Sequence, residues 1–156
     1  MPSDSLFLDR LAEALATVDL EAIVIGNSAS ILHGAPVLTL DVDLLVRDTR
    51  ANRRKLDQLS DELGGVQTDV GDLTTAIRIH LPDVSVDVLF DSMGGGLTFN
   101  SVRSRASRIR VDEHSLTVAS LEDVIASKEA VGRAKDLASL PILRDTLRVK
   151  NALKKR

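Results

Sequence analysis

The stretch that decides the fold runs from residue 26 to residue 46 and reads GNSASILHGAPVLTLDVDLLV. A short apolar run rich in β-branched residues precedes it and predicts a buried strand over residues 22–25. The residues after that strand predict a short helix over 28–33, which Gly34 ends. A second strand is predicted over 40–46. The order strand, tight turn, helix and strand indicates a mixed α/β core.

Two acidic residues stand at alternate positions of the second strand. Side chains two apart on a strand point to the same side of the sheet, so Asp41 and Asp43 are expected to project together. Asp87 repeats the arrangement on a later strand, between two valines. Neighbouring carboxylates repel one another unless a cation lies between them, and Mg²⁺ or Mn²⁺ prefers carboxylate oxygens. The competing interpretation is that the first pair is only the polar side of an edge strand.

The rest of the chain alternates between helical and strand patterns. A stretch over 91–107 contains Gly94-Gly95-Gly96 and is predicted to be a mobile loop that acts as a lid or hinge. The remaining predictions are helices over 5–18, 50–63, about 120–132 and from 134 onward with a start or kink at Pro141, a hairpin of strands 75–80 and 85–90, and short strands 108–111 and 116–118.

Taken together, the stretch 26–46 resembles the signature of the nucleotidyltransferase superfamily that includes DNA polymerase β. It is most similar to small bacterial members related to the AbiEii toxins and the minimal nucleotidyltransferases. The stretch SLEDVIASKEAVGRAKDLASL at 120–140 also resembles that group. The resemblance implies one nucleotidyltransferase-like domain over 1–156, of class α/β (α+β). Its core would be a mixed sheet flanked by helices, over about 20–118, with C-terminal helices over about 120–156 packed on it.

The resemblance also implies a role for each motif residue. The metal, Mg²⁺ or Mn²⁺, would be held by the three carboxylates of Asp41, Asp43 and Asp87, and the last of these is the candidate general base. A nucleoside triphosphate such as ATP is the implied substrate, and Lys128 is expected to offset its phosphate charge. The residues assigned to nucleotide binding are Gly26, Asn27, Ser28 and Thr39.

Three functions follow as alternatives. The first is transfer of a nucleoside monophosphate from the triphosphate to a hydroxyl of tRNA or protein, as in the toxin of a toxin–antitoxin or phage-defence pair with a cognate antitoxin as partner. The second is a binding protein that keeps the fold without catalysis. It is favoured mildly by Asn27, where the family often has Gly, and by Val37, where the family often has a basic residue. The third is modification of a small molecule such as an antibiotic.

Composition narrows these choices. The chain of 156 residues has no Cys, which excludes disulfides and thiolate chemistry, and only 2% aromatic residues, so base stacking contributes little. No apolar run is long enough to span a bilayer, and the acidic start over 1–20 is unlike a signal peptide, so we expect a cytoplasmic protein. A cluster of basic side chains favours a polyanionic acceptor such as tRNA, with surface pairing as the alternative: Arg103, Arg105, Arg108 and Arg110.

Overall fold

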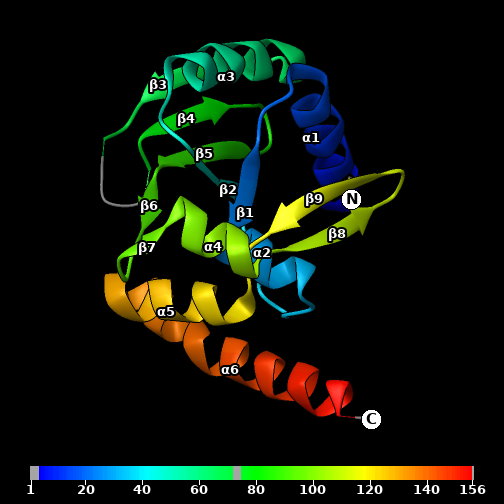
Figure 1. Ribbon diagram of the computed structural model, residues 1–156, viewed down its shortest axis with the longest axis vertical. Coiled ribbons are helices and arrows are strands. Elements are labelled where there is room, and N and C mark those ends of the chain that lie inside the picture. The colour runs from blue at the N-terminus through cyan, green and yellow to red at the C-terminus, as the bar shows by residue number, and fades with distance from the viewer. Residues whose placement is uncertain (1–3, 72–74, 156) are drawn as a thin grey trace.

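A computed structural model describes residues 4–71 and 75–155 of the chain. Its main feature is a seven-stranded mixed sheet in the order β3-β4-β5-β2-β1-β9-β8 (Figure 1). A separate pair of two-residue strands, β6 and β7, follows β5. The strands are β1 (Ala22–Ile25), β2 (Asp41–Val46), β3 (Val66–Asp69), β4 (Ile77–His80), β5 (Ser85–Phe90), β6 (Ser92–Met93), β7 (Leu97–Thr98), β8 (Ser107–Val111) and β9 (His114–Val118).

Six helices surround the sheet in the described part of the chain. In Figure 1, α3 lies above the strands and α1 beside it, whereas α5 and α6 stack below. Helix α1 packs against α3 and against β8 and β9, and α2 packs against β1, β2 and α5. The helices are α1 (Asp4–Val18), α2 (Gly26–Leu32), α3 (Arg50–Leu63), α4 (Phe99–Arg105), α5 (Leu121–Val131) and α6 (Ala134–Lys154). This mixed α/β architecture confirms the predicted fold class.

Strand β2 lies at the centre of the sheet and fixes the position of the aspartates. It pairs antiparallel with β1 and parallel with β5, in a register that sets Asp43 opposite Asp87. Between the aspartates, the apolar side chains point the other way, into the core: Val42, Leu44, Val86 and Val88 are each at most 5% exposed. Burial of these side chains holds the strand register, because a slip by one residue would turn the carboxylates into the core.

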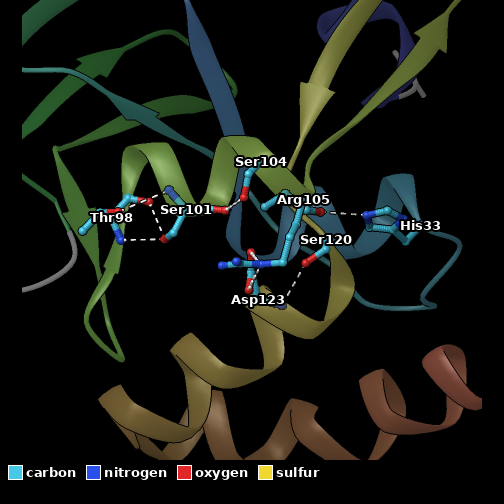
Figure 2. A network of polar contacts seen from close by, with 8 residues as sticks. His33, Thr98, Ser101, Ser104, Arg105, Ser120 and Asp123 are labelled. Atoms are coloured by element: carbon cyan, nitrogen blue, oxygen red, sulfur yellow. Dashed lines mark hydrogen bonds and ion pairs between the residues drawn. The ribbon is translucent and has the colours of Figure 1, made fainter.

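The prediction of a mobile loop over 91–107 is wrong. The segment forms the β6–β7 hairpin and the helix α4, and Gly94 packs so closely on α5 that a Cβ would lie 2.6 Å from a methyl of Val131. A capping box begins α4, since the Thr98 side chain accepts from the Ser101 amide while the Ser101 hydroxyl accepts from the Thr98 amide (Figure 2). Burial of Phe99 then anchors the helix to the core.

The structure also contains one strand that was not predicted. Strand β3 was not predicted, because its four residues are mostly exposed and lack an apolar alternation. Helix α6 starts at Ala134, as predicted, after an N-cap at Arg133, and it continues through Pro141 without a new start there. Helix α5 begins directly after its predicted N-cap Ser120, and Gly132 ends it with a positive φ of 68°. Among the described helices, none combines the length and apolar character that crossing a membrane requires.

Candidate active site

The structure brings the three predicted carboxylates together on one side of the sheet. Asp41 and Asp43 point the same way from β2, and Asp87 lies beside Asp43 on the adjacent strand β5. All three line a cleft of about 250 Å³ between the sheet and the helices α5 and α6. Asp87 is only 4% exposed, so its charge must be balanced by groups within the cleft.

Two polar side chains from the β4–β5 hairpin contact these carboxylates. Arg78 forms a paired contact with Asp87, in which Nε donates to Oδ1 at 2.7 Å and a terminal nitrogen donates to Oδ2 at 3.2 Å. The Ser85 hydroxyl lies 2.6 Å from Oδ1 of Asp41 and 3.2 Å from Oδ1 of Asp87. One hydroxyl hydrogen is therefore shared between two carboxylates, which holds them close together.

Asp43 carries the strongest electrostatic perturbation of the cleft. Its burial raises the pKa, and the charges of Asp87 and Asp41 raise it further, to about 7, against the opposing effect of Lys128 and Lys135. A carboxyl group with this pKa is partly protonated near neutral pH, because burial removes it from water and two neighbouring carboxylates repel its charge. A cation bound among the three aspartates would stabilise the charged form of Asp43 and lower this pKa.

The opposite wall of the cleft is basic and comes from α5 and α6. Lys128 is buried, and its ammonium lies 3.5 Å from Oδ1 of Asp136, itself 2% exposed. Burial lowers the pKa of Lys128, while Asp136 and Asp43 raise it. The Arg133 guanidinium also binds Asp136, with Nε 2.8 Å from Oδ2. Asp136 thereby fixes two cations at the rim of the cleft, and Lys135 lines it beside them.

The turn after β1 approaches the carboxylates closely. At Gly26, φ is +65°, and a Cβ would lie 2.4 Å from Oδ2 of Asp43, so no larger residue fits without displacing that carboxylate. Asn27 also lines the cleft, and its buried Oδ1 has no hydrogen-bond partner among the described residues. Two hydroxyls, those of Ser28 and Thr39, donate to the Asp41 carbonyl at 3.0 and 2.8 Å.

Ser28 differs from the other predicted nucleotide-binding residues. Its side chain is 2% exposed and is used to hold the Asp41 carbonyl, so its hydroxyl faces the protein rather than the cleft. The remaining predicted site residues line the cleft: Gly26, Asn27, Thr39, Asp41, Asp43, Asp87 and Lys128.

His33 ends α2 and connects it to the C-terminal helix. Its Nε2 lies 2.8 Å from the Ala119 carbonyl, which can only accept, so Nε2 carries the hydrogen (Figure 2). Its Nδ1 is then left to accept from the Lys150 ammonium at 2.6 Å. Burial lowers the pKa of His33, against the opposing effect of the Ala119 bond. The ring is a structural link between α2 and α6 and does not line the cleft.

The four clustered arginines lie apart from this cleft. Among the cleft-lining residues in the described part of the chain, none of the four appears. Arg105 reaches from α4 to Asp123 at the start of α5, with Nε 2.9 Å from Oδ2 (Figure 2). Arg103 pairs with Glu21 at 2.8 Å. On the outermost strand β8, Arg108 bonds to hydroxyls of β9, and Arg110 bonds to a backbone carbonyl.

The donor set of the cleft suits a divalent cation in its chemistry. Asp41, Asp43 and Asp87 supply hard carboxylate oxygens on adjacent strands, and the raised pKa of Asp43 reflects its burial beside two other carboxylates. Nevertheless, no group of three acidic or histidine side chains within residues 4–71 and 75–155 already encloses a metal position. Arg78 instead engages both oxygens of Asp87, so an ion would compete with this guanidinium.

Comparison with known proteins finds similarity in structure alone. No protein-family model matches the sequence, and no curated protein matches it. The antibiotic-resistance factor ANT(2'')-Ia superimposes with a TM-score of 0.67 over 97% of this chain and 94% of its own, at 13% sequence identity. The chain has the nucleotidyltransferase fold.

Two further solved structures share this fold. The lincosamide antibiotic adenylyltransferase LnuA, with lincomycin bound, gives a TM-score of 0.65 over 92% of this chain and 97% of its own, at 11% identity. An antigenic nucleotidyltransferase-like protein from Paracoccidioides brasiliensis gives 0.58 over 93% and 75%, at 16% identity. At such identities the similarity concerns the fold, and activity must be argued from the site.

Arg78 is the most consequential site residue that sequence reasoning missed. The predicted hairpin already contained the signal: counting outward from the Leu81–Val84 turn pairs His80 with Ser85 and therefore Arg78 with Asp87. Side chains opposite one another on adjacent strands share a side of the sheet. Lys135 carried no comparable signal, because its place in the cleft depends on how α6 packs.

Proposed function

We propose that this chain is a metal-dependent nucleotidyltransferase that moves a nucleoside monophosphate from a nucleoside triphosphate to an acceptor hydroxyl. The observation that carries the proposal is the convergence of Asp41, Asp43 and Asp87 from adjacent strands, facing a wall of fixed cations across one cleft. Acidic groups on one wall suit metal ions, and basic groups on the other suit phosphates.

Each side of the cleft has its own role in this proposal. The carboxylates of Asp41, Asp43 and Asp87 would hold Mg²⁺ or Mn²⁺, which when bound offsets phosphate charge and assists attack at the α-phosphorus. Lys128 and Lys135 would contact the phosphates, and Gly26 lets the turn after β1 approach the Asp43 carboxylate closely. Asn27 lines the cleft and would contact the nucleotide through its side-chain amide.

In the proposed transfer, one bond to the α-phosphorus forms and another breaks. The acceptor oxygen forms a bond to the α-phosphorus while the bond from that phosphorus to the bridging oxygen breaks, and pyrophosphate leaves with the bonding electrons. The proton of the acceptor hydroxyl passes to a carboxylate, for which Asp87 is the candidate base. Asp87 would accept it after releasing Arg78, whose guanidinium is then available to the leaving group.

The contact between Arg78 and Asp87 favours a second candidate function. Because a guanidinium already satisfies both oxygens of this carboxylate, the chain can bind a nucleotide through the basic wall without completing a metal site. It would then be a nucleotide-binding protein without transferase activity. The two candidates differ in whether bound nucleotide is ever transferred.

Of the possible acceptors, we favour a small molecule. ANT(2'')-Ia is an antibiotic-resistance factor, and it has been solved in complex with adenylyl-2''-tobramycin; LnuA is a lincosamide antibiotic adenylyltransferase. Transfer to tRNA or protein, with a toxin–antitoxin role, is the alternative. It receives little support from the four arginines of α4 and β8, since these bind the chain's own groups outside the cleft.

The decisive experiment incubates the protein with each α-labelled nucleoside triphosphate, Mg²⁺ or Mn²⁺, and separate pools of small molecules, tRNA and protein. Transfer of label that is lost in Asp43→Asn supports the enzyme. The matched control is Asp57→Asn, which removes an exposed carboxylate of α3 that does not line the cleft. Binding of nucleotide without transfer to any pool supports the second candidate instead.

A further inference from the structure

A second cavity, larger than the cleft and different in character, adjoins the carboxylates. It has a volume of about 430 Å³ and lies where α1, α2, the end of α3 and the β4–β5 turn meet. Most of its lining surface among the described residues is apolar, contributed for example by Phe7, Ile31, Leu63, Leu81 and Val84. A cavity of this size and lining is of the kind that binds drug-sized molecules.

The cavity shares a wall with the candidate active site. Thr39 and Asp41 line both the cavity and the cleft, and Ser28 lines the cavity from the other side. The hydroxyls of Ser28 and Thr39 fix this wall by donating to the same Asp41 carbonyl. A molecule in the cavity would thus end beside the first carboxylate of β2, where a transferred group must arrive.

The charges of the two spaces differ, and the difference indicates what each one takes. Lys128, Arg133 and Lys135 line the cleft, which suits the phosphates of a nucleotide. Only Arg10 is a cation among the residues that line the cavity in the described ranges, against two acids, Asp41 and Asp83. Arg10 also lies over the Phe7 ring at 6.0 Å and donates to the Leu63 carbonyl. A polyanion would find little compensation for its charge here.

The segment around Thr39, which lies between the cavity and the cleft, exposes apolar side chains to solvent. Leu38 and Leu40 flank Thr39 and are 91% and 79% exposed, although most large aliphatic side chains of this chain are buried. Exposed leucines next to an apolar cavity extend the surface available to an apolar ligand. They offer nothing to a phosphate backbone.

We infer that the cavity is the acceptor site of the proposed transferase, and that the acceptor is a small, largely apolar molecule that carries a hydroxyl group and is not a polyanion. This inference rests on the proposed function. The hydroxyl oxygen reaches past Asp41 to the α-phosphorus of a nucleoside triphosphate in the cleft. A phosphodiester forms, pyrophosphate leaves with the electrons of the broken bond, and the hydroxyl proton passes to a carboxylate.

Binding is tested first, without any nucleotide. The probe is prodan, a neutral naphthalene dye whose emission moves to shorter wavelength in apolar surroundings. Val84 is half-buried in the β4–β5 turn and lines the cavity, so Val84→Trp should fill it and weaken prodan binding at least tenfold. The matched control, Val66→Trp, adds the same side chain to an exposed position of β3 that does not line the cavity.

If Val84→Trp does not fold, as judged by its circular dichroism, Val84→Lys takes its place, since it brings a charge into the cavity with less added volume. Wild-type protein that leaves prodan emission unchanged overturns the inference. Equal prodan affinity in the wild type and in a folded Val84 variant also overturns it, because the dye would then bind elsewhere.

Transfer is tested second, on acceptors taken from a cell lysate. An organic-solvent extract, total tRNA and the protein fraction are each incubated with α-labelled nucleoside triphosphate and Mg²⁺. Label in the organic extract that falls at least tenfold in Val84→Trp, with nucleotide binding intact, supports the acceptor site. Label that appears only in tRNA or protein, and is unaffected by Val84→Trp, overturns the acceptor site but leaves the proposed transferase activity supported.

The remaining outcomes separate the two proposals. Nucleotide binding without transfer to any pool overturns both the transferase and the acceptor role, and leaves a nucleotide-binding protein. Absence of nucleotide binding in the wild type refutes the proposed function at its first step. In either case, prodan binding that is lost in Val84→Trp would still identify the cavity as a site for an apolar ligand.

Discussion

Replacing Asp43 by Asn is the sharpest test of the electrostatic account of the cleft. Asn keeps the shape of the side chain and removes its charge, so the cost of burying that charge and its repulsion by Asp87 and Asp41 both disappear. A carboxyl group with a raised pKa favours folding at low pH, and this contribution is lost as the pH rises toward the folded pKa. The metal-free wild type should therefore lose stability relative to Asp43→Asn as the pH rises from about 4 to about 7.

The size of this effect follows from the pKa. A rise from 3.8 to about 7 corresponds to about 4 kcal/mol at ~1.4 kcal/mol for each tenfold change in proton affinity. Solvent reaches part of the side chain and screens the repulsion, so we expect Asp43→Asn to be more stable by roughly 2–4 kcal/mol at pH 8. About half of that difference should develop between pH 5 and pH 7.

The assay is urea unfolding of both proteins at pH 5, 6, 7 and 8 in the presence of a chelator, with Asp57→Asn as the control. In a second series with excess Mg²⁺, the free energy of unfolding should rise in the wild type but not in Asp43→Asn. Ligand at a hundredfold excess over its dissociation constant adds about 2.7 kcal/mol. A stability difference that stays constant from pH 5 to pH 8, or a loss of stability in Asp43→Asn at pH 8, would refute the reasoning.

Three other substitutions test separate parts of the structure. Gly26→Ala should lower the melting temperature by several degrees more than Gly96→Ala, since both glycines have φ near +65° but a Cβ meets a carboxylate only at position 26; equal losses would contradict the close approach. Arg78→Met should lower metal-free stability and enlarge the rise in melting temperature caused by Mn²⁺, because Asp87 loses its competing cation; an unchanged response would place the ion elsewhere. A histidine with a lowered pKa stabilises the fold above its ordinary pKa of 6.5, and this contribution is lost as the pH falls below 6.5. Stability should therefore fall less steeply below pH 6.5 in His33→Gln than in the wild type, and parallel pH profiles of the two proteins would contradict this.

The sequence sufficed for the parts of the fold with strong local patterns. The strand at 22–25, the helix at 50–63 and the paired aspartates depend on periodicity and on caps that lie within a few residues. The strand β3 and the helix α4 escaped prediction for a related reason. β3 is held mainly by its pairing with β4, to which a hydrogen bond between the Thr68 hydroxyl and Nε2 of His80 contributes. α4 is seven residues long and depends on burial of Phe99 after a glycine run.

Only the site residues whose direction follows from their position in a strand could be predicted from the sequence. Alternation along β2 and β5 indicates which carboxylates converge, but not that Arg78 binds one of them or that Lys128 becomes buried against Asp136. Those contacts depend on the packing of separate elements. The apolar cavity could not be predicted from the sequence, because five separate segments of the chain contribute its walls.

The sheet is open, and its outer strands determine how molecules meet at high concentration. An outer strand displays N–H and C=O groups that a strand from another molecule can join, which leads to aggregation. On one side β3 offers only four residues. On the other, β8 carries Arg108 and Arg110, whose bulk and charge oppose docking by a second copy. Arginines that first suggested nucleic acid thus occupy an outer edge of the sheet, where charged side chains oppose the pairing of strands between molecules.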